Sequence, residues 1–266
     1  MGDKNNDFWE MLESEFFSNH DEKDMNGTVP VSYVVPSEEN NRQILNIIFV
    51  IDVSGSMEGT RIAQVNYALE NIFKEMKGRD DLNSTVKVGI MLFSESARWL
   101  TIRPIPLDDY VFSPITVQPS LTFYGKAFDA LEEKLHKREF MNPDLGEYYS
   151  PLILFISDGE PIDIGDYPKS LERLKNNPWF KKASKYAIAV GNDARGQKVG
   201  KILSDFTGIK QNVRHVDEGA ALCNLIEFIA IRASEVQTSM VSSAPGGYET
   251  SESIFKDVDE TMFLWS

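Results

Sequence analysis

The stretch IIFVIDVSGSM, residues 47–57, decides how the rest of the chain is interpreted. Five consecutive apolar residues lead directly into Asp52, and Ser54 and Ser56 follow at alternate positions. An unbroken apolar run of this kind is typical of a strand that is covered on both faces of a sheet. The carboxylate and the two hydroxyls therefore stand at the end of a buried strand, which is where open parallel sheets bind their ligands.

Strand-like and helix-like patterns alternate from residue 44 onward. Apolar runs typical of strands occupy residues 44–52, 86–94, 98–102, 151–158, 186–191 and 212–216. Helical periodicity occurs from Ile62 to Met76 and over 124–137, 168–182, 197–206 and about 219–234. The short connection between 86–94 and 98–102 indicates a hairpin at one sheet edge. This alternation predicts a three-layer α/β domain with a mostly parallel, doubly wound sheet and one antiparallel edge strand.

Charge is distributed unevenly along the 266 residues. The formal net charge is −14, with −7 over residues 1–43 and −5 over residues 235–266, which leaves −2 for 44–234. This balance argues against a protein that binds nucleic-acid phosphates or an anionic membrane. We expect an acidic N-terminal extension over 1–43, which could hold a short helix and an edge strand, and a flexible acidic tail over 235–266.

The sequence also suggests a cellular compartment. The single cysteine, Cys223, excludes a disulfide within the chain and fits a reducing environment. The first residues lack a basic segment followed by an apolar one, and no apolar run approaches the ~20 residues of a membrane span. We therefore expect a soluble cytoplasmic protein.

A second apolar run, residues 151–158, also ends in an aspartate, Asp158. If the two strands are neighbours, Asp52 and Asp158 face one crevice at the carboxyl ends of the strands. Thr122 stands just before the helical segment 124–137 and could face the same side. Together with the serines, these residues offer two carboxylates and three hydroxyls, hard oxygen donors that suit Mg²⁺ or Mn²⁺ and suit zinc poorly.

Each of these features also has an ordinary structural explanation. Serines between a strand and a helix commonly cap the helix, and the Asp158-Gly159 pair is typical of a turn. The Asp-x-Ser-x-Ser pattern is therefore weak by itself. Its position at the end of one buried strand, with Ser-Asp-Gly at the end of a second, favours a functional site.

The whole set has a known counterpart. Asp52-x-Ser54-x-Ser56, Thr122-x-x-Gly125 and Asp158-Gly159 together resemble the metal-ion-dependent adhesion site of von Willebrand factor A (VWA) domains. Within that family, the segments VIDVSGSM, IMLFSESARWL, LTFYGKAFDAL, FISDGEPID and YAIAVGNDA are most similar to the bacterial TerY-like proteins of tellurite-resistance and stress systems. The resemblance covers about residues 44–234 and implies a VWA, Rossmann-like fold for them.

The resemblance implies a role for each residue of the set. Ser54 and Ser56 would bind the cation directly, and Thr122 would do so directly or through water. Asp52 and Asp158 would hold bound waters and orient the serines. Because neutral donors leave most of the charge of a cation uncompensated, an open coordination position would accept an Asp or Glu from a partner protein.

The partner would also contact residues around the cation. We expect this rim to comprise Gly55, Met57, Phe123, Tyr124, Gly159 and Glu160. The function that the resemblance implies is a non-enzymatic, metal-dependent protein–protein interaction module, a scaffold in a bacterial stress-response or phospho-signalling assembly.

The same residues are compatible with two other functions. A Mg²⁺-dependent hydrolase or phosphatase could use Asp52 and Ser54, but the serine would need a base, for which His215 is the only candidate, and the Gly-x-Ser-x-Gly spacing is absent. A phosphate or nucleotide binder could use the Ser/Gly loop at a helix N-terminus. The chain has no Gly-Lys-Ser/Thr motif, and Asp52 and Asp158 would repel phosphate without a bridging metal.

The acidic tail suggests a further hypothesis. It carries the acids Glu249, Glu252, Asp257, Asp259 and Glu260. One of them could occupy the open position of the cation, within the chain or between two copies, because a tether supplies an effective concentration on the order of millimolar. The simpler interpretation is that the tail only keeps the protein soluble.

Overall fold

A computed structural model describes residues 43–78, 84–138, 140–141, 148–190 and 194–216, together with residues 224, 226, 230 and 231. The chain divides at residue 42 into two units, and all the described residues belong to the second. The N-terminal helix and edge strand expected within 1–43, Cys223 and the tail 235–266 lie outside the described residues.

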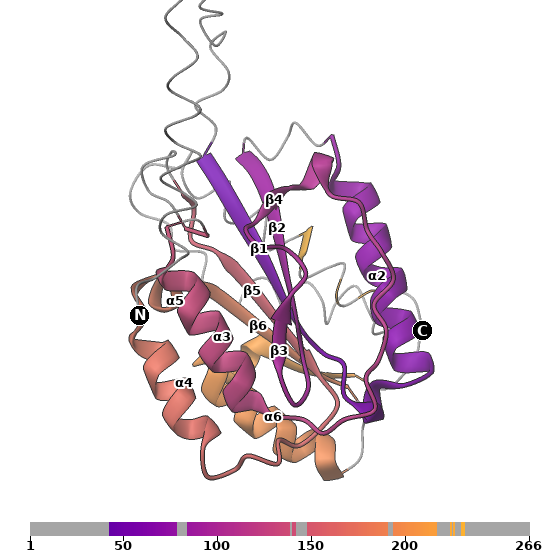
Figure 1. Ribbon diagram of the computed structural model, residues 1–266, viewed down its shortest axis with the longest axis vertical. Coiled ribbons are helices and arrows are strands. Elements are labelled where there is room, and N and C mark those ends of the chain that lie inside the picture. Colours follow the sequence, from indigo (N-terminus) through magenta and orange to yellow (C-terminus); the bar gives the residue numbers. More distant parts are fainter. Residues whose placement is uncertain are drawn as a thin grey trace, which may run out of the picture. The chain divides into compact units, whose positions relative to one another are not determined.

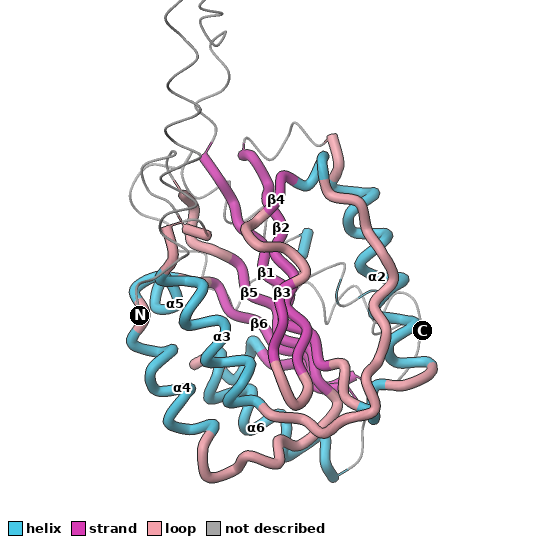
Figure 2. The backbone as a smooth tube through the Cα atoms, in the orientation of Figure 1, coloured by secondary structure: helices cyan, strands magenta, loops and turns pink. Residues whose placement is uncertain are grey.

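A mostly parallel sheet of seven strands forms the centre of the described unit (Figures 1 and 2). The strand order is β3-β2-β1-β5-β6-β7, and β4 also pairs with β2. Neighbours along β2-β1-β5-β6-β7 are parallel, whereas β3 and β4 run antiparallel to β2. The strands are β1 (Gln43–Asp52), β2 (Ser84–Phe93), β3 (Ala97–Trp99), β4 (Ile105–Pro106), β5 (Leu152–Ser157), β6 (Ser184–Val190) and β7 (Val213–Val216). The predicted α/β architecture is confirmed, with two short antiparallel strands at the edge where one was expected.

Helices cover both faces of this sheet. They are α2 (Thr60–Met76), α3 (Tyr124–His136), α4 (Tyr167–Asn176), α5 (Pro178–Lys182) and α6 (Ala194–Thr207), with short 3-10 turns η1 (Gly55–Met57), η2 (Leu107–Asp109) and η4 (Lys210–Asn212). Figure 1 shows α2 on one side of the sheet, with α3 and α4 on the other. Among the described residues, no helix has the length and apolar character needed to cross a bilayer.

The single helix predicted over 168–182 is wrong, because the chain breaks at Asn177 into α4 and α5. Pro178 has no N–H to continue the first helix, and a residue that precedes proline avoids the helical conformation. The side chain of Asn177 instead accepts hydrogen bonds from the backbone N–H groups of Trp179 and Phe180 and so caps the second helix.

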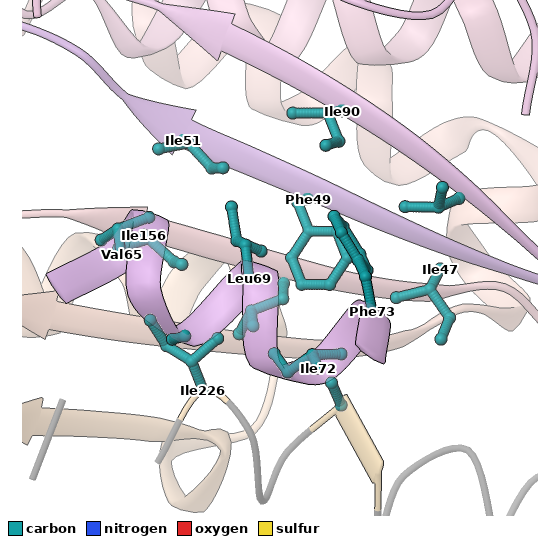
Figure 3. Packing of buried hydrophobic residues seen from close by; sticks show 14 of the residues in the cluster. Ile47, Phe49, Ile51, Val65, Leu69, Ile72, Phe73, Ile90, Ile156 and Ile226 are labelled. Atoms are coloured by element: carbon teal, nitrogen blue, oxygen red, sulfur yellow. The ribbon is translucent and has the colours of Figure 1, made fainter. Parts of the chain in front are cut away.

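Strand β1 contributes to a hydrophobic core on each face of the sheet. Every residue from Ile44 to Asp52 is buried, as expected for a strand that is covered on both sides. Phe49 points toward α2, where its ring meets that of Phe73 edge to face at 5.8 Å, in the core drawn in Figure 3. Ile48 belongs to the opposite core, which the residues of α3, α4 and α6 complete.

The connection from η2 to α3 brings Thr122 to the end of the sheet. It follows α2 toward the carboxyl ends of the parallel strands (Figure 2). Asn66 of α2 holds this connection through both backbone groups of Ile115, accepting from its N–H at 2.7 Å and donating to its C=O at 2.9 Å. Farther along, the Gly55 N–H donates to the carbonyl of Ser120 at 3.0 Å. Residues remote in sequence thus meet beside the loop that follows β1.

Candidate metal centre

Two carboxylates lie side by side at the carboxyl ends of β1 and β5. The strands are parallel neighbours in which Ile51 pairs with Ile156, so Asp52 ends one and Asp158 follows the other. Asp52 is fully buried, and both of its oxygens are hydrogen-bonded. Oδ1 accepts from the Ser54 backbone N–H at 2.8 Å and Oδ2 accepts from the Ser157 hydroxyl at 2.6 Å.

Burial changes the acidity of Asp52. Removal from water raises the pKa of this carboxyl from 3.8 to about 6, against the opposing effect of the hydrogen bonds from Ser157 and Ser54. The negative charge of Asp158 raises the pKa of Asp52 further. Since a nearby divalent cation would favour the ionised form, Asp52 is a carboxylate whose environment suits a positive charge close by.

The two serines connect the loop after β1 to Asp158. Ser56 donates its hydroxyl hydrogen to Asp158 Oδ1 at 2.8 Å. The Ser54 and Ser56 hydroxyl oxygens lie 3.1 Å apart, and since the hydrogen of Ser56 is already committed, Ser54 is the donor of this pair. The three side chains form a continuous row of oxygen atoms.

Thr122 faces the same space from a third segment. A Cβ placed on Gly159 would lie 3.0 Å from Thr122 Oγ1 and 3.6 Å from Ser56 Oγ. Gly159 therefore leaves open a small volume onto which two hydroxyls from distant parts of the chain converge. The Thr122 carbonyl accepts from the N–H of Ile162 at 2.9 Å, which holds this segment in place.

The sequence prediction missed three residues that support this cluster. Ser157 orients Asp52, and Arg61, on the first turn of α2, donates to Asp158 Oδ2 and, at 3.2 Å, to the Ser56 carbonyl. Asp163 accepts from the backbone N–H groups at the start of α3, from Tyr124 at 3.1 Å and from Gly125 at 2.7 Å. Ser157 had a sequence signal in the Ser-Asp-Gly pattern, and Arg61 had one as a basic residue soon after the serines, whereas Asp163 had none.

The close contact with Asp163 explains why the fourth residue of Thr122-x-x-Gly125 is glycine. A Cβ on Gly125 would lie 2.6 Å from Asp163 Oδ2 and would force this carboxylate away from the helix. A negative charge at a helix N-terminus is favourable, and here it also fixes the start of α3 directly after Thr122.

The cluster opens into a cavity of about 640 Å³. Its lining residues are Ser54, Gly55, Ser56, Arg61, Ser120, Leu121, Thr122, Asp158, Gly159, Glu160, Ile162, Val190 and Lys198. Leu121 and Ile162 are about half exposed and supply apolar surface at its edge. Lys198 lies 3.3 Å from the Glu160 carboxylate across the same opening.

Part of the predicted rim is wrong. Gly55, Gly159 and Glu160 do line the cavity. Met57, however, is fully buried in the core beneath α2, because η1 turns its side chain inward. Tyr124 is fully buried too, with its hydroxyl donating to the Gly159 carbonyl at 3.1 Å and its ring packed on Phe93 and Phe155.

Two further predictions can be compared with the cavity. Phe123 is half-buried and is not among the lining residues. His215, the candidate base of a hydrolase, lines a different cavity between α6 and β7, where its ring lies against Gly200. Of the described residues that line the cavity at Ser54, none is a histidine, so His215 is not positioned to act as a base for that serine.

The donor atoms of the cluster fit a hard divalent cation. Within the described ranges there is no group of three or more His, Cys, Asp or Glu side chains, so a metal would depend on the hydroxyls as well as the carboxylates. Three hydroxyls and two carboxylates, with room left open at Gly159, form an all-oxygen set of the kind that Mg²⁺ and Mn²⁺ prefer.

Comparison with known families decides the identity of the fold. Residues 46–227, more than half of the chain, match the family model of the von Willebrand factor type A domain. The chain belongs to this family. VWA domains commonly mediate metal-dependent protein–protein interactions.

Relatives of this VWA domain occur within much longer proteins. The chain is 24% identical over 204 residues to inter-alpha-trypsin inhibitor heavy chain H4 of Homo sapiens, with 75% of this chain and 21% of that protein covered. It is 26% identical over 189 residues to heavy chain H6 of the same organism, with 66% and 14% covered. The chain thus spans about a fifth or less of the length of these relatives.

Solved structures share the fold at low sequence identity. The pilus adhesin SpaC from Lactobacillus rhamnosus GG has a TM-score of 0.55 at 11% identity, with 75% of this chain and 31% of that chain covered. A von Willebrand factor type A protein from Catenulispora acidiphila has a TM-score of 0.52 at 12% identity, with 74% and 43% covered. These likenesses support the three-layer fold of the VWA domain.

Proposed function

We propose that this VWA domain is a non-enzymatic module that binds a protein partner through a divalent cation, with an Asp or Glu of the partner as one ligand. One observation carries the proposal. The hydroxyls of Ser56 and Thr122 converge on the open space at Gly159, and Asp158 accepts a hydrogen bond from the first of them. Oxygen donors from three separate segments are thus close together at this point.

Each residue then has a role that its chemistry supports. The hydroxyls of Ser54 and Ser56 would bind the ion directly, and that of Thr122 directly or through water. Asp52 and Asp158 would hold bound waters and keep the serines in position. Neutral hydroxyl ligands leave most of the charge of a divalent ion uncompensated, so a carboxylate from a partner would form a charge-assisted bond with it.

The ion we propose is Mg²⁺, or Mn²⁺ in its place. The preference rests on the all-oxygen donor set, because hard oxygen ligands select these ions and zinc is commonly held by histidine or cysteine. The apolar edge that Leu121 and Ile162 provide suits a partner whose acidic residue is flanked by a large apolar side chain.

Two features of the sequence support a biological setting for the proposed module. The TerY-like segments support a scaffold in a bacterial stress-response or phospho-signalling assembly, and the single cysteine supports the cytoplasm. The acidic residues 235–266 remain a candidate source of the carboxylate, within the chain or between copies. Truncation at Ser234 tests that idea, since an unchanged oligomeric state and unchanged partner affinity would exclude it.

A pull-down with the full chain as bait tests the proposal. The bait is incubated with an extract of its source cells in Mg²⁺ and, in parallel, in a chelator. We expect a protein that is retained in Mg²⁺, released by the chelator and lost with Ser56→Ala. Ser120→Ala is the matched control, because this serine lines the same cavity but bonds to the Gln118 carbonyl. A partner that is retained equally in Mg²⁺, in the chelator and on the Ser56→Ala bait would contradict the proposal.

A further inference from the structure

Arg61 places a positive charge in direct contact with the candidate metal centre. It is the second residue of α2, and its guanidinium donates to Asp158 Oδ2 and, at 3.2 Å, to the carbonyl of Ser56. The Asp158 side chain is fully buried, whereas that of Arg61 is a quarter exposed. The arginine therefore closes the solvent side of a carboxylate that would otherwise lie buried as an unpaired charge.

Both oxygens of Asp158 accept hydrogen bonds. Oδ1 accepts from the Ser56 hydroxyl and Oδ2 accepts from the guanidinium. A divalent ion at the open space beside Gly159 would need the same carboxylate and the same serine. Two cations would then compete for one acid, and a buried site screens their mutual repulsion far less than water does.

We propose that Arg61 is a resident counter-ion of the metal centre that lowers the affinity of the centre for its divalent cation. This inference rests on the metal site of the proposed function. Asp52, Asp158 and Arg61 carry a formal charge of −1 together when both acids are ionised, so a bound divalent ion leaves the centre at +1. Without the arginine the loaded centre would be neutral.

The remaining positive charge has a consequence for binding. A partner carboxylate neutralises it, so the ion is held more firmly when the partner is present than when the domain is alone. Arg61 thereby couples retention of the metal to occupation by an acidic ligand. A purely structural arginine has no such effect, and its removal would weaken metal binding or leave it unchanged.

Titration of the full chain with Mn²⁺, followed through the electron paramagnetic resonance of the free ion, measures this effect. We expect Arg61→Gln to bind Mn²⁺ about tenfold more tightly than the native chain, the scale of one charge interaction at a partly buried site. Arg61→Lys keeps the charge and is expected to remain within about threefold of native, because it restores the competition. Arg103→Gln is the control, since Arg103 lies beside Lys87 near the start of β2, at the opposite end of the sheet.

The outcomes separate the two proposals. If the native chain binds Mn²⁺ and Arg61→Gln binds it with equal or lower affinity, the counter-ion role is overturned, whereas the proposed metal centre is not. Absence of saturable binding in every variant would overturn both. Circular dichroism confirms that each variant is folded, and Arg61→Met, which keeps the length of the side chain, replaces Arg61→Gln if that variant does not fold.

Discussion

Ser157 donates a 2.6 Å hydrogen bond to the buried carboxylate of Asp52 and so joins the ends of β5 and β1. Both side chains are fully inaccessible to solvent. The bond fixes the orientation of Asp52, whose other oxygen accepts from the backbone of Ser54. These two hydrogen bonds therefore anchor the loop that carries the serines to the floor of the site.

The burial of Asp52 predicts a dependence of stability on pH. Its pKa is about 6 in the folded protein and 3.8 when exposed, so the folded protein keeps a proton between these values that the unfolded chain releases. The stability contributed by this proton is fully present below pH 3.8 and is lost as pH rises through about 6. Asp52→Asn removes the effect, because the amide stays neutral.

Chemical denaturation in a chelator, at pH 4 and at pH 7, measures this effect. The free energy of unfolding of Asp52→Asn minus that of the native chain should increase by about 2 kcal/mol between the two pH values. Subtracting the native value at each pH removes the contribution of the other carboxylates. A difference that stays constant from pH 4 to pH 7 would show that Asp52 titrates as an ordinary exposed acid.

The contact between Gly125 and Asp163 predicts the effect of a single methyl group. Gly125→Ala should lower the free energy of unfolding by about 1 to 2 kcal/mol, because it displaces the carboxylate that caps α3. Gly165→Ala is the control, since its Cβ would meet no atom within 4 Å, and its effect should be close to zero. Equal effects of the two substitutions on urea denaturation would refute this role for Asp163.

Two hydrogen bonds join the Asn66 side chain to the backbone of Ile115. They predict that this side chain stabilises the connection that leads to Thr122. Asn66→Ala leaves both backbone groups of Ile115 without their partner and should cost about 2 kcal/mol of stability. On the same helix, Glu70→Ala removes only an exposed pair with Lys74 and should cost less than about 0.5 kcal/mol. Thermal unfolding of the two variants gives the comparison, and similar midpoints would contradict the prediction.

Much of this fold could be predicted because the apolar runs are long and buried. The apolar run that ends at Asp52 forms β1. The run that ends at Asp158 forms β5, which ends at Ser157, one residue before the aspartate. The rule that parallel strands end at one edge of the sheet predicted that both aspartates lie at that edge, whereas the adjacency of the two strands was a condition that the structure supplies. The break at Asn177 was also visible in principle, as an asparagine before a proline, but helical periodicity continues across it and masked the signal.

The parts of the site that were missed depend on long-range contacts. Asp163 lies 39 residues after Tyr124, the first residue of α3, and no local sequence pattern marks a contact at that separation. The inward turn of Met57 depends on the geometry of η1, which a motif position does not reveal. The sequence alone could therefore suggest which residues carry the oxygen atoms and could not indicate which neighbours are accessible to a partner.

The open space beside Gly159 predicts that a substitution there weakens metal binding and has little effect on stability. Gly159→Ala would put a methyl group 3.0 Å from Thr122 Oγ1, in the space where the ion is proposed to lie. We expect Mn²⁺ affinity to fall at least about tenfold, while the free energy of unfolding changes by less than about 1 kcal/mol. Gly55 lines the same cavity, and a Cβ placed on it would have its nearest contact at 3.8 Å. Gly55→Ala should therefore keep native affinity for Mn²⁺. Unchanged affinity in Gly159→Ala would place the ion elsewhere.

The most direct test of the central claim is calorimetric titration of the full chain with Mn²⁺, because the claim is that three separate segments hold one ion. The native chain and Ser120→Ala should each bind one ion with the same affinity. Ser56→Ala and Thr122→Ala, which alter segments more than sixty residues apart, should each weaken binding at least about tenfold. Saturable binding that Thr122→Ala leaves unchanged, or no binding by the native chain, would contradict the account.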